Sequence, residues 1–528
     1  MTTGRWIALL TLLLIQPAAA QSIRPERTRF AETSSYEDVL AFLDSLQVLS
    51  GNLRVGTLAT SPEGRRVPYV IAARPMVTSA AEARRNQKLV VYLQANIHAG
   101  EVEGKEAAQM LLRDLAAGRL RGLLQRMVLL VVPIYNADGN EHWASGEENR
   151  PGQNGPERVG RNTNGQGLNL NRDYVKMEAP ETRGSAALLR AWDPELFMDL
   201  HTTNGSYHGY VLTYAPGLNP NLNPSVEFVR DRFLPLVRQR MQGRHGQKTF
   251  SYGNFRNQNP DSLVQGWETY DARPRFGTNW MGLRGRLSVL SEGYSNADFH
   301  TRITATYNFV REVLQLAAEQ ASVIRGLVAA SDRRRPPSLA VRSTLGPPIE
   351  RPVIAELTED TGAGNGGYAP RRRTGVYRTI RMPVYDRFVA ARTESVPAGY
   401  VVPARLSAIV NLLRLQGVAV QQLTRPWRGQ VKTFRVDSVG ADSLFEGHHP
   451  ARVEGSWLSQ PADTVLAAGT YLVDTDQPLG ILAAYLLEPA SEDGFGTWNF
   501  LDSELKAGAP HPVARVDTRP AAPAVAVP

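Results

Sequence analysis

The chain has 528 residues, of which 42% are hydrophobic and 21% are charged, and its formal net charge is +8. At about 100 to 200 residues per domain, this length predicts two or three domains, and the composition is that of a globular protein with ample material for a core. The chain has no cysteine, which excludes a disulfide scaffold, a cysteine-ligated zinc and a lipid-anchored N-terminal cysteine.

The N-terminal segment has the features of a secretory signal. Arg5 precedes an apolar run over residues 6–15, and Pro17 with three alanines offers a small-residue cleavage site before Gln21. The run is shorter than the roughly 20 residues that cross a bilayer, so residues 1–20 are predicted to be a removable signal peptide. We therefore expect an exported protein without a membrane span, located in a bacterial periplasm or secreted.

Residues 33–330 carry strand-like and helix-like segments in alternation. Ser34 and Ser35 precede apolar residues at helical spacing, which predicts a capped helix. Strands are expected at residues 53–58, 67–72, 89–97, 127–135 and 196–200, and helices at 103–117, 224–241 and 301–325. Buried strands that alternate with helices predict an α/β catalytic domain, built on a mixed, twisted sheet flanked by helices.

The composition changes beyond residue 330. Residues 331–375 begin rich in Arg and Pro and end rich in Gly, so they are interpreted as a linker region. Residues 376–510 are rich in β-forming residues and contain a short helical pattern over 406–415, which predicts a smaller mixed α/β or β-rich C-terminal domain. The Pro- and Ala-rich residues 511–528 are expected to form a disordered tail.

Candidate metal ligands lie at the ends of two predicted strands. His98 and Glu101 follow the apolar run 89–97, and His201 follows the run 196–200. An α/β sheet usually presents its site at strand ends. Two imidazoles and a carboxylate make a three-ligand zinc site with a fourth position for water. The pattern predicts one zinc ion per chain.

Further motifs follow in order: the turn 136–139, Arg161, the segment Asn169 to Arg172, and Glu292 at the end of an apolar run. With these motifs, roughly residues 33–325 resemble the zinc carboxypeptidase family, the carboxypeptidase A/B-like metallopeptidases. That family has a His-x-x-Glu pair, an Asn-Pro-Asp-Gly-like turn, an Asp-x-Asn-Arg clamp, a later His ligand and a late catalytic Glu. The resemblance implies an exported bacterial member of this family.

The resemblance also implies roles for the site residues. Glu292 would accept a proton from the metal-activated water and pass it to the leaving amine. Arg161 is the best match to the family's catalytic arginine, which stabilises the oxyanion, although Arg150 and Arg158 share its loop. Asn171 and Arg172 would bind the free C-terminal carboxylate of a peptide.

Some residues depart from the family pattern. Asn169 stands where the family usually has Asp, Ala137 replaces the Pro of the turn, and two threonines follow His201 where digestive members carry Ser-Tyr. Tyr270 is the nearest candidate for the family's substrate-covering tyrosine. These departures bear on the identity of the substrate more than on the metal site, and the sequence does not predict which side chain the enzyme prefers.

Three functions are therefore compared. The leading hypothesis is a zinc carboxypeptidase that releases C-terminal residues from peptides. The alternative is a zinc amidase or endopeptidase that acts on N-acyl amino acids or cell-wall peptides, and the Arg172 clamp argues against it. A third possibility is an inactive homologue that binds peptides or glycans, and the intact ligand set with Glu292 argues against it.

Nucleic acid is not expected as a partner. The basic clusters 333–335 and 371–373 lie beside Pro- and Gly-rich stretches and lack interleaved aromatic residues. Such clusters are typical of solvated linker charge. The expected partner is a peptide substrate, and the sequence does not determine the oligomeric state.

Overall fold

The structure is a computed structural model that describes residues 22–361 and 371–527. The expected signal peptide and most of the Gly-rich segment after residue 361 lie outside these residues. Within the described part of the chain, no helix is long and apolar enough to cross a membrane.

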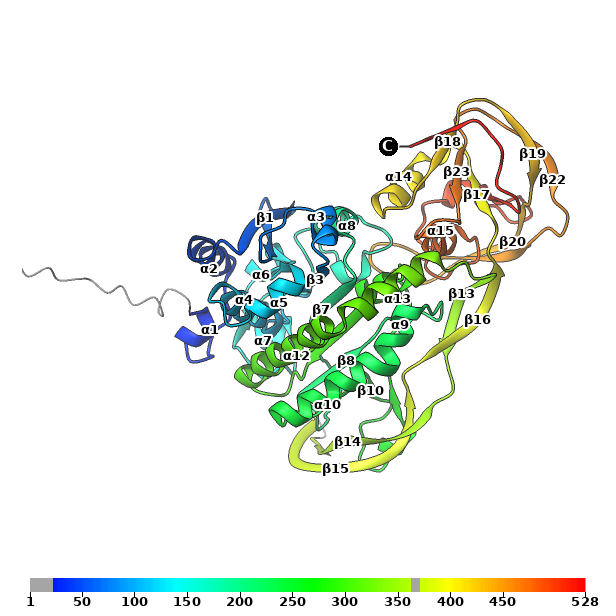
Figure 1. The fold of residues 1–528 in the computed structure, drawn as a ribbon. Coiled ribbons are helices and arrows are strands. Elements are labelled where there is room, and N and C mark those ends of the chain that lie inside the picture. The colour runs from blue at the N-terminus through cyan, green and yellow to red at the C-terminus, as the bar shows by residue number, and fades with distance from the viewer. Residues whose placement is uncertain (1–21, 362–370, 528) are drawn as a thin grey trace, which may run out of the picture.

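An eight-stranded mixed sheet forms the centre of the N-terminal region (Figure 1). Its strand order is β1-β2-β4-β3-β7-β12-β8-β9. The inner strands β3, β4, β7 and β12 run parallel and are buried along their whole length, which explains the nearly continuous apolar sequences of β3 and β4. The strands are β1 (Leu53–Thr60), β2 (Arg66–Ala72), β3 (Leu89–Ala95), β4 (Met127–Val132), β7 (Leu196–Thr202), β8 (Leu212–Ala215), β9 (Thr249–Ser251) and β12 (Leu287–Gly293).

Helices flank this sheet, and α10, α12 and α13 cross its front in Figure 1. The predicted mixed sheet with flanking helices is therefore confirmed. Ser35 caps the first long helix, because its side chain accepts a hydrogen bond from the Asp38 backbone N–H. The longer helices are α2 (Tyr36–Leu49), α4 (Glu103–Ala116), α8 (Pro180–Trp192), α10 (Leu234–His245), α12 (Phe299–Glu319) and α13 (Ala321–Arg333). Shorter ones are α1 (Arg24–Arg27), α3 (Ala80–Arg85), α5 (Arg121–Arg126), α6 (Ala137–Glu141), α7 (Gly146–Asn149), α9 (Pro224–Phe228) and α11 (Gly277–Leu283).

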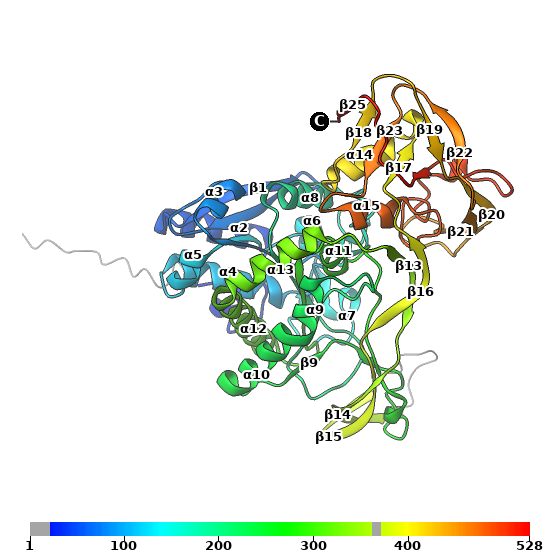
Figure 2. The same ribbon diagram turned by 45° about the vertical axis from the view of Figure 1, so that its right-hand side comes forward.

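The segment 331–375, expected to be a linker, instead contains strands. Its described part holds the end of α13, β13 (Ser338–Leu345), β14 (Ile349–Asp360) and the start of β15 (Arg371–Tyr385). β14 pairs with β15, and β15 pairs with the short strand β11 (Trp267–Glu268) of the N-terminal region. In Figure 2 this hairpin lies at the foot of the molecule.

Alternating burial explains the hairpin. Val353, Ala355, Met382 and Val384 pack in one cluster with Trp267, while the arginines point outward. Two of the outward arginines are paired: Arg372 and Arg373 contact Glu359 and Glu356 of β14. The Arg and Pro content concealed this period-two pattern in the sequence.

The C-terminal region is a β-rich unit of several small sheets with two helices, as predicted. Its main sheet has the order β24-β17-β23-β18-β25. The elements are β16 (Phe388–Ser395), β17 (Gly399–Val402), α14 (Ser407–Leu415), β18 (Gln421–Leu423), β19 (Trp427–Val431), β20 (Phe434–Ala441), β21 (Ala451–Trp457), β22 (Ala462–Leu466), β23 (Tyr471–Asp474), α15 (Gly480–Leu487), β24 (Ala514–Val516) and β25 (Ala524–Ala526).

The expectation of a disordered tail over 511–528 is wrong for the described residues up to 527. β24 and β25 form the two outer strands of the main sheet, where they pair with β17 and β18. Backbone hydrogen bonds at the sheet edges order this segment, and the side chains of Val513 and Val516 are buried in the core.

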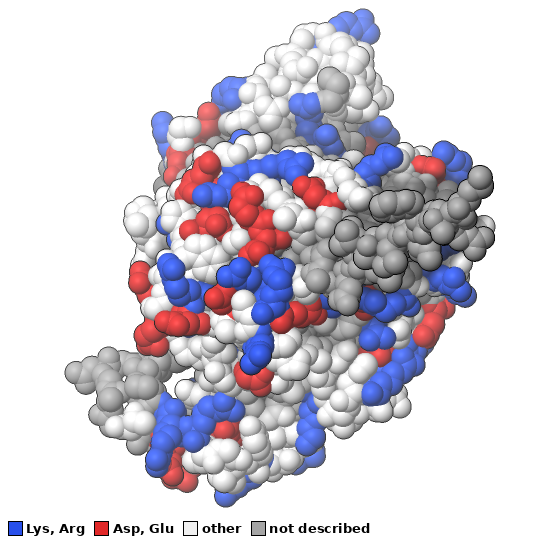
Figure 3. Space-filling view, turned by 90° about the vertical axis from the view of Figure 1, so that its left-hand side faces the viewer, with Lys and Arg blue, Asp and Glu red and all other residues white. Residues whose placement is uncertain are grey.

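The two regions share buried contacts. A single hydrophobic cluster contains residues from both, including Trp280 and Trp498. Arg275 of the N-terminal region forms a buried ion pair with Asp493 at 2.7 Å. On the face drawn in Figure 3, basic and acidic side chains of the described residues lie interspersed rather than in patches of one sign.

Candidate active site

The three predicted metal ligands lie together at the ends of two neighbouring strands. His98 and Glu101 occupy the turn between β3 and α4, and His201 lies in β7, which pairs in parallel with β3. The Nδ1 atoms of His98 and His201 lie 3.0 and 2.9 Å from the two carboxylate oxygens of Glu101. The ligand atoms of all three residues lie within 4.8 Å of one another. The structure thus brings together residues a hundred positions apart.

The far nitrogens of both imidazoles face oxygen acceptors. His98 Nε2 lies 3.0 Å from Asn169 Oδ1, and His201 Nε2 lies 3.1 Å from Asp199 Oδ2. Such acceptors orient a metal-binding imidazole and fix its tautomer. Asn169, which departs from the family's usual Asp, still supplies an oxygen at this position.

Electrostatics at the cluster favours a cation. Burial alone would raise the pKa of Glu101, yet Arg150 and both imidazoles hold this pKa well below its usual value. Burial opposes protonation of His201, but Asp199 and Glu101 raise its pKa well above the usual range. Two carboxylates therefore surround one buried imidazole. An oxygen and two nitrogen donors with this charge fit Zn²⁺ and leave a fourth position free.

Glu292 lies beside the cluster in β12, where it pairs in register with His201 of β7. The residue is 7% exposed, and its Oε2 has no hydrogen-bond partner among the described residues. Burial raises the pKa of its carboxyl group to about 8. A buried carboxylate without a partner is suited to accept a proton.

The clamp residues lie next to the ligands. Asn171 Nδ2 is 3.4 Å from His201 Nε2, and its Oδ1 accepts a hydrogen bond from the Gly277 backbone N–H. The Arg172 guanidinium lies over the Phe276 ring, with its carbon 4.0 Å from the ring centre. Its Nη1 donates to Asn171 O, which leaves other donors of the guanidinium for a ligand.

Two arginines of one loop differ in their surroundings. Arg161, the residue indicated by the motif, donates to the backbone carbonyls of Thr163 and Asn164. Arg150 is buried, and its Nη1 lies 3.3 Å from Glu101 Oε1. The described structure thus brings Arg150, and not Arg161, into contact with the ligand cluster. No local signal in the sequence separates these arginines, because the folding of the whole loop decides which one turns inward.

Two half-buried tyrosines lie near Glu292. The rings of Tyr252 and Tyr270 are 5.7 Å apart, and Tyr270 also packs against Phe276. Burial raises the pKa of both phenols well above the usual value, and the Glu292 charge adds to this. Sequence reasoning singled out Tyr270 but missed Tyr252, which belongs to no recognisable motif.

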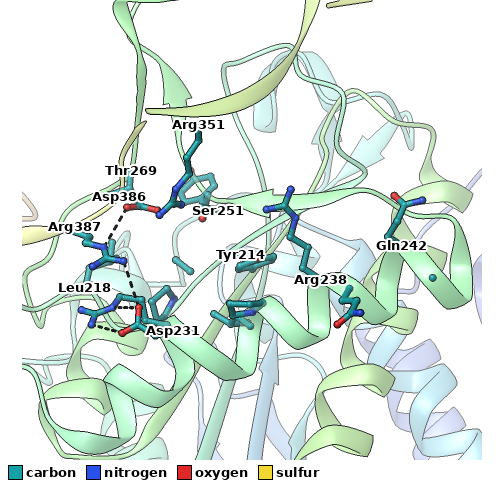
Figure 4. Close-up of a pocket in the computed structure, with 18 residues that line it drawn as sticks. Tyr214, Leu218, Asp231, Arg238, Gln242, Ser251, Thr269, Arg351, Asp386 and Arg387 are labelled. Atoms are coloured by element: carbon teal, nitrogen blue, oxygen red, sulfur yellow. Dashed lines mark hydrogen bonds and ion pairs between the residues drawn. The ribbon is translucent and has the colours of Figure 1, made fainter. Parts of the chain in front are cut away.

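A separate cavity of about 750 Å³, drawn in Figure 4, includes Tyr252 among its lining residues. Its charged residues are largely paired: Arg230 contacts Asp231, and Arg351 contacts Asp386. None of the predicted site residues lines this cavity. The candidate site is therefore recognised by its chemistry and not by the size of a cavity.

Comparison with known proteins shows similarity to carboxypeptidases. Residues 39–217 match the family model described as zinc carboxypeptidase, a span that includes the three ligands and the clamp but not Glu292. Carboxypeptidase 2 of Trichophyton tonsurans is 25% identical over 482 residues, which cover 87% of this chain and 81% of the relative. Carboxypeptidase 2 of Trichophyton rubrum is 27% identical over 476 residues, with 86% and 81% covered.

Among solved structures, the metallo-carboxypeptidase of Burkholderia cenocepacia is 19% identical and has a TM-score of 0.40, and the match covers 55% of this chain and 70% of that chain. The family match and the curated relatives are consistent with the ligand cluster on the sheet. The similarity to zinc carboxypeptidases, over residues 39–217 for the family model and over most of the chain for the two relatives, supports a metal-dependent hydrolase of peptides.

Proposed function

We propose that this protein is an exported zinc carboxypeptidase that releases C-terminal residues from peptides. The observation that carries this proposal is the meeting of three groups in one place: a His-Glu-His cluster, a buried carboxylate without a partner, and an arginine with free donors. The first suits metal binding, the second proton transfer, and the third recognition of a carboxylate. The signal-like residues 1–20 support export, which N-terminal sequencing of the mature protein would test.

His98, Glu101 and His201 would hold the zinc ion, which when bound lowers the pKa of a bound water from ~15.7 to near ~7. Asn169 and Asp199 support this arrangement, because an oxygen of each lies 3.0 or 3.1 Å from the outer nitrogen of one imidazole. The rings are thereby held with Nδ1 toward the metal position.

Glu292 would act as the general base. Its unpartnered Oε2 can take the proton from the attacking water and then deliver it to the leaving amine. Burial between β7 and β8 keeps bulk water from competing for the carboxylate.

A cation near the ligands would stabilise the developing oxyanion. We assign this role to Arg150, because its guanidinium already contacts Glu101. Arg161, the residue first expected there, would have to release the Thr163 and Asn164 carbonyls to reach the same position.

Arg172 and Asn171 would bind the C-terminal carboxylate of the substrate. A guanidinium can form two parallel hydrogen bonds with a carboxylate, and a nearby amide adds a directed donor. The Phe276 ring holds the guanidinium plane in place. A site of this kind selects a free C-terminus and therefore favours removal of terminal residues over internal cleavage.

The test compares a free-acid peptide with its C-terminal amide. Amidation removes a charge-assisted hydrogen bond, which is worth about 1.5 to 3 kcal/mol, so kcat/KM should fall at least about tenfold. Arg172→Ala should narrow this gap by slowing the free acid most. Arg119→Ala, an exposed arginine paired with Asp114, serves as the control and should leave the gap unchanged.

The alternatives predict other outcomes. Equal kcat/KM values for the two peptides would contradict the exopeptidase hypothesis and favour an endopeptidase or amidase. If a chelator does not reduce turnover, the proposed role of the metal in catalysis is contradicted. Peptide binding without turnover in zinc-loaded protein would favour an inactive binding homologue.

A further inference from the structure

The segment 442–450, which joins β20 to β21 in the C-terminal region, reaches the candidate active site. Three contacts fix its position. His448 Nε2 lies 2.9 Å from Glu178 Oε1 of the N-terminal region, and His448 Nδ1 lies 3.1 Å from Asn499 Oδ1. The Phe445 ring lies near the Arg275 guanidinium, 5.2 Å from its carbon to the ring centre. The segment is therefore held on both sides of Glu446.

Glu446 lies next to the support of a predicted metal ligand. Its Oε2 accepts a hydrogen bond of 3.3 Å from the Asn169 backbone N–H, and the side chain of Asn169 contacts His98. The backbone of Glu446 is left-handed, with φ of 50°, and Gly447 follows with φ of 78°. This tight turn holds the half-buried Glu446 carboxylate at the tip of the segment.

The charge of Glu446 acts on the clamp. Burial lowers the pKa of Arg172, and the carboxylates of Glu446 and Asp271 oppose this shift. Asp271 is already paired with Arg273, whose Nε lies 2.9 and 2.7 Å from its two oxygens. Glu446 forms no ion pair with any described residue. Of the two acids Asp271 and Glu446, it is therefore Glu446 whose charge is not neutralised by an ion pair among the described residues.

A bound peptide would change this balance. If its C-terminal carboxylate neutralises Arg172, the nearby Glu446 charge loses the cation that compensates for it. A positive group on the substrate would restore neutrality, whereas a negative group would add a like charge in a half-buried place.

We propose that Glu446 is a specificity-determining residue, by which the C-terminal region makes the enzyme prefer a basic side chain in the last two residues of its substrate and reject an acidic one. The proposal rests on the proposed function, because it requires Arg172 to hold the C-terminal carboxylate.

A purely structural role for Glu446 is the competing explanation, since its hydrogen bond also holds Asn169. Glu446→Gln separates the two roles. The glutamine keeps an oxygen acceptor for the Asn169 N–H but removes the charge. A structural role predicts equal effects on all peptides, whereas a charge role predicts effects that depend on the peptide.

The experiment measures kcat/KM of the full-length, zinc-loaded enzyme. The peptides are free acids that differ only in Lys, norleucine or Glu at the last or the penultimate residue. The parent should prefer Lys over norleucine and norleucine over Glu at one of these positions. Glu446→Gln should reduce the ratio of kcat/KM for the Lys peptide to kcat/KM for the Glu peptide about tenfold, which is the effect of losing one charge-assisted contact. Its kcat/KM for the norleucine peptide should change little.

Asp437→Asn is the matched control, because it removes an exposed carboxylate from the same hairpin, where Asp437 is paired with Arg435. This variant should keep the parent ratio. Added salt should lower the parent ratio and leave the Glu446→Gln ratio nearly constant, since screening acts on charge.

The outcomes separate the two proposals. A parent that cleaves the norleucine peptides but has the same Lys-to-Glu ratio as Glu446→Gln would overturn the role of Glu446 and leave the carboxypeptidase intact. A uniform loss on all peptides in Glu446→Gln would assign the residue a structural role and also overturn the proposal. A parent that cleaves none of the free acids would overturn the proposed function, and the specificity role with it.

Discussion

Two buried glutamates, one in each region, have opposite surroundings. Glu488 of the C-terminal region accepts hydrogen bonds from the Tyr400 hydroxyl, from Trp457 Nε1 at 3.2 Å and from Arg515 Nε at 2.8 Å. Glu292 of the N-terminal region has an Oε2 without any partner among the described residues. A buried carboxylate that is fully paired holds the fold together, whereas an unpaired one costs stability and is kept where chemistry needs it.

The same contrast separates other polar groups of the two regions. Around His98 and His201, the oxygens converge on a position that suits a cation. In the contacts between the regions, the Arg275 and Asp493 charges neutralise each other. Glu446 of the C-terminal region differs from Asp493, because it lies near the candidate site and forms no ion pair with any described residue.

The first prediction compares the same substitution, Glu to Gln, at the two buried glutamates. Glu292→Gln should lower kcat about 10²- to 10⁴-fold, because it removes the proton acceptor while the fold and bound zinc remain. Glu488→Gln should instead leave Arg515 underneutralised and lower the free energy of unfolding by about 3 to 5 kcal/mol. Enzyme kinetics, zinc content and denaturant unfolding measure both. Near-parental activity in Glu292→Gln would remove this residue from its assigned role.

The second prediction tests the contact between the regions. Asp493→Asn should lower the free energy of unfolding by about 3 to 5 kcal/mol, because it leaves the buried Arg275 charge without its partner. Arg275→Gln combined with Asp493→Asn should recover part of this loss, since no charge then remains buried. Thermal unfolding of the parent and of both variants measures these effects. An unchanged unfolding temperature in Asp493→Asn would show that the regions do not depend on this pair.

The third prediction concerns the outer support of the metal position. Asp199→Asn should weaken zinc binding about 10- to 100-fold, because the negative charge of a carboxylate 3.1 Å from His201 Nε2 raises the basicity of this ligand. Competition with a chromophoric chelator measures the affinity. Asp474→Asn, which alters a carboxylate of β23 in the C-terminal region, is the control and should bind zinc like the parent. Equal affinities in both variants would contradict the role of Asp199.

Much of the N-terminal region could be predicted from sequence. Its inner strands are continuous apolar runs, because both faces of a central parallel sheet are covered. The ligand pair is equally local: His98 and Glu101 are three residues apart after such a run. His201 follows another run, and parallel pairing of β3 with β7 brings the two strand ends together. Local sequence patterns were therefore sufficient to predict the sheet and the ligand cluster.

Other features depended on the tertiary structure. The β14–β15 hairpin packs on Trp267, about a hundred positions earlier, and its Arg-rich outer face concealed its buried one. The tail strands are ordered by sheet edges far away in the chain. Arg150 turns to Glu101 and Glu446 reaches Asn169 only because distant segments fold against each other. A short motif records which groups are available, but long-range packing decides which of them meet, because the free energy of such contacts comes from neighbours that the local sequence does not contain.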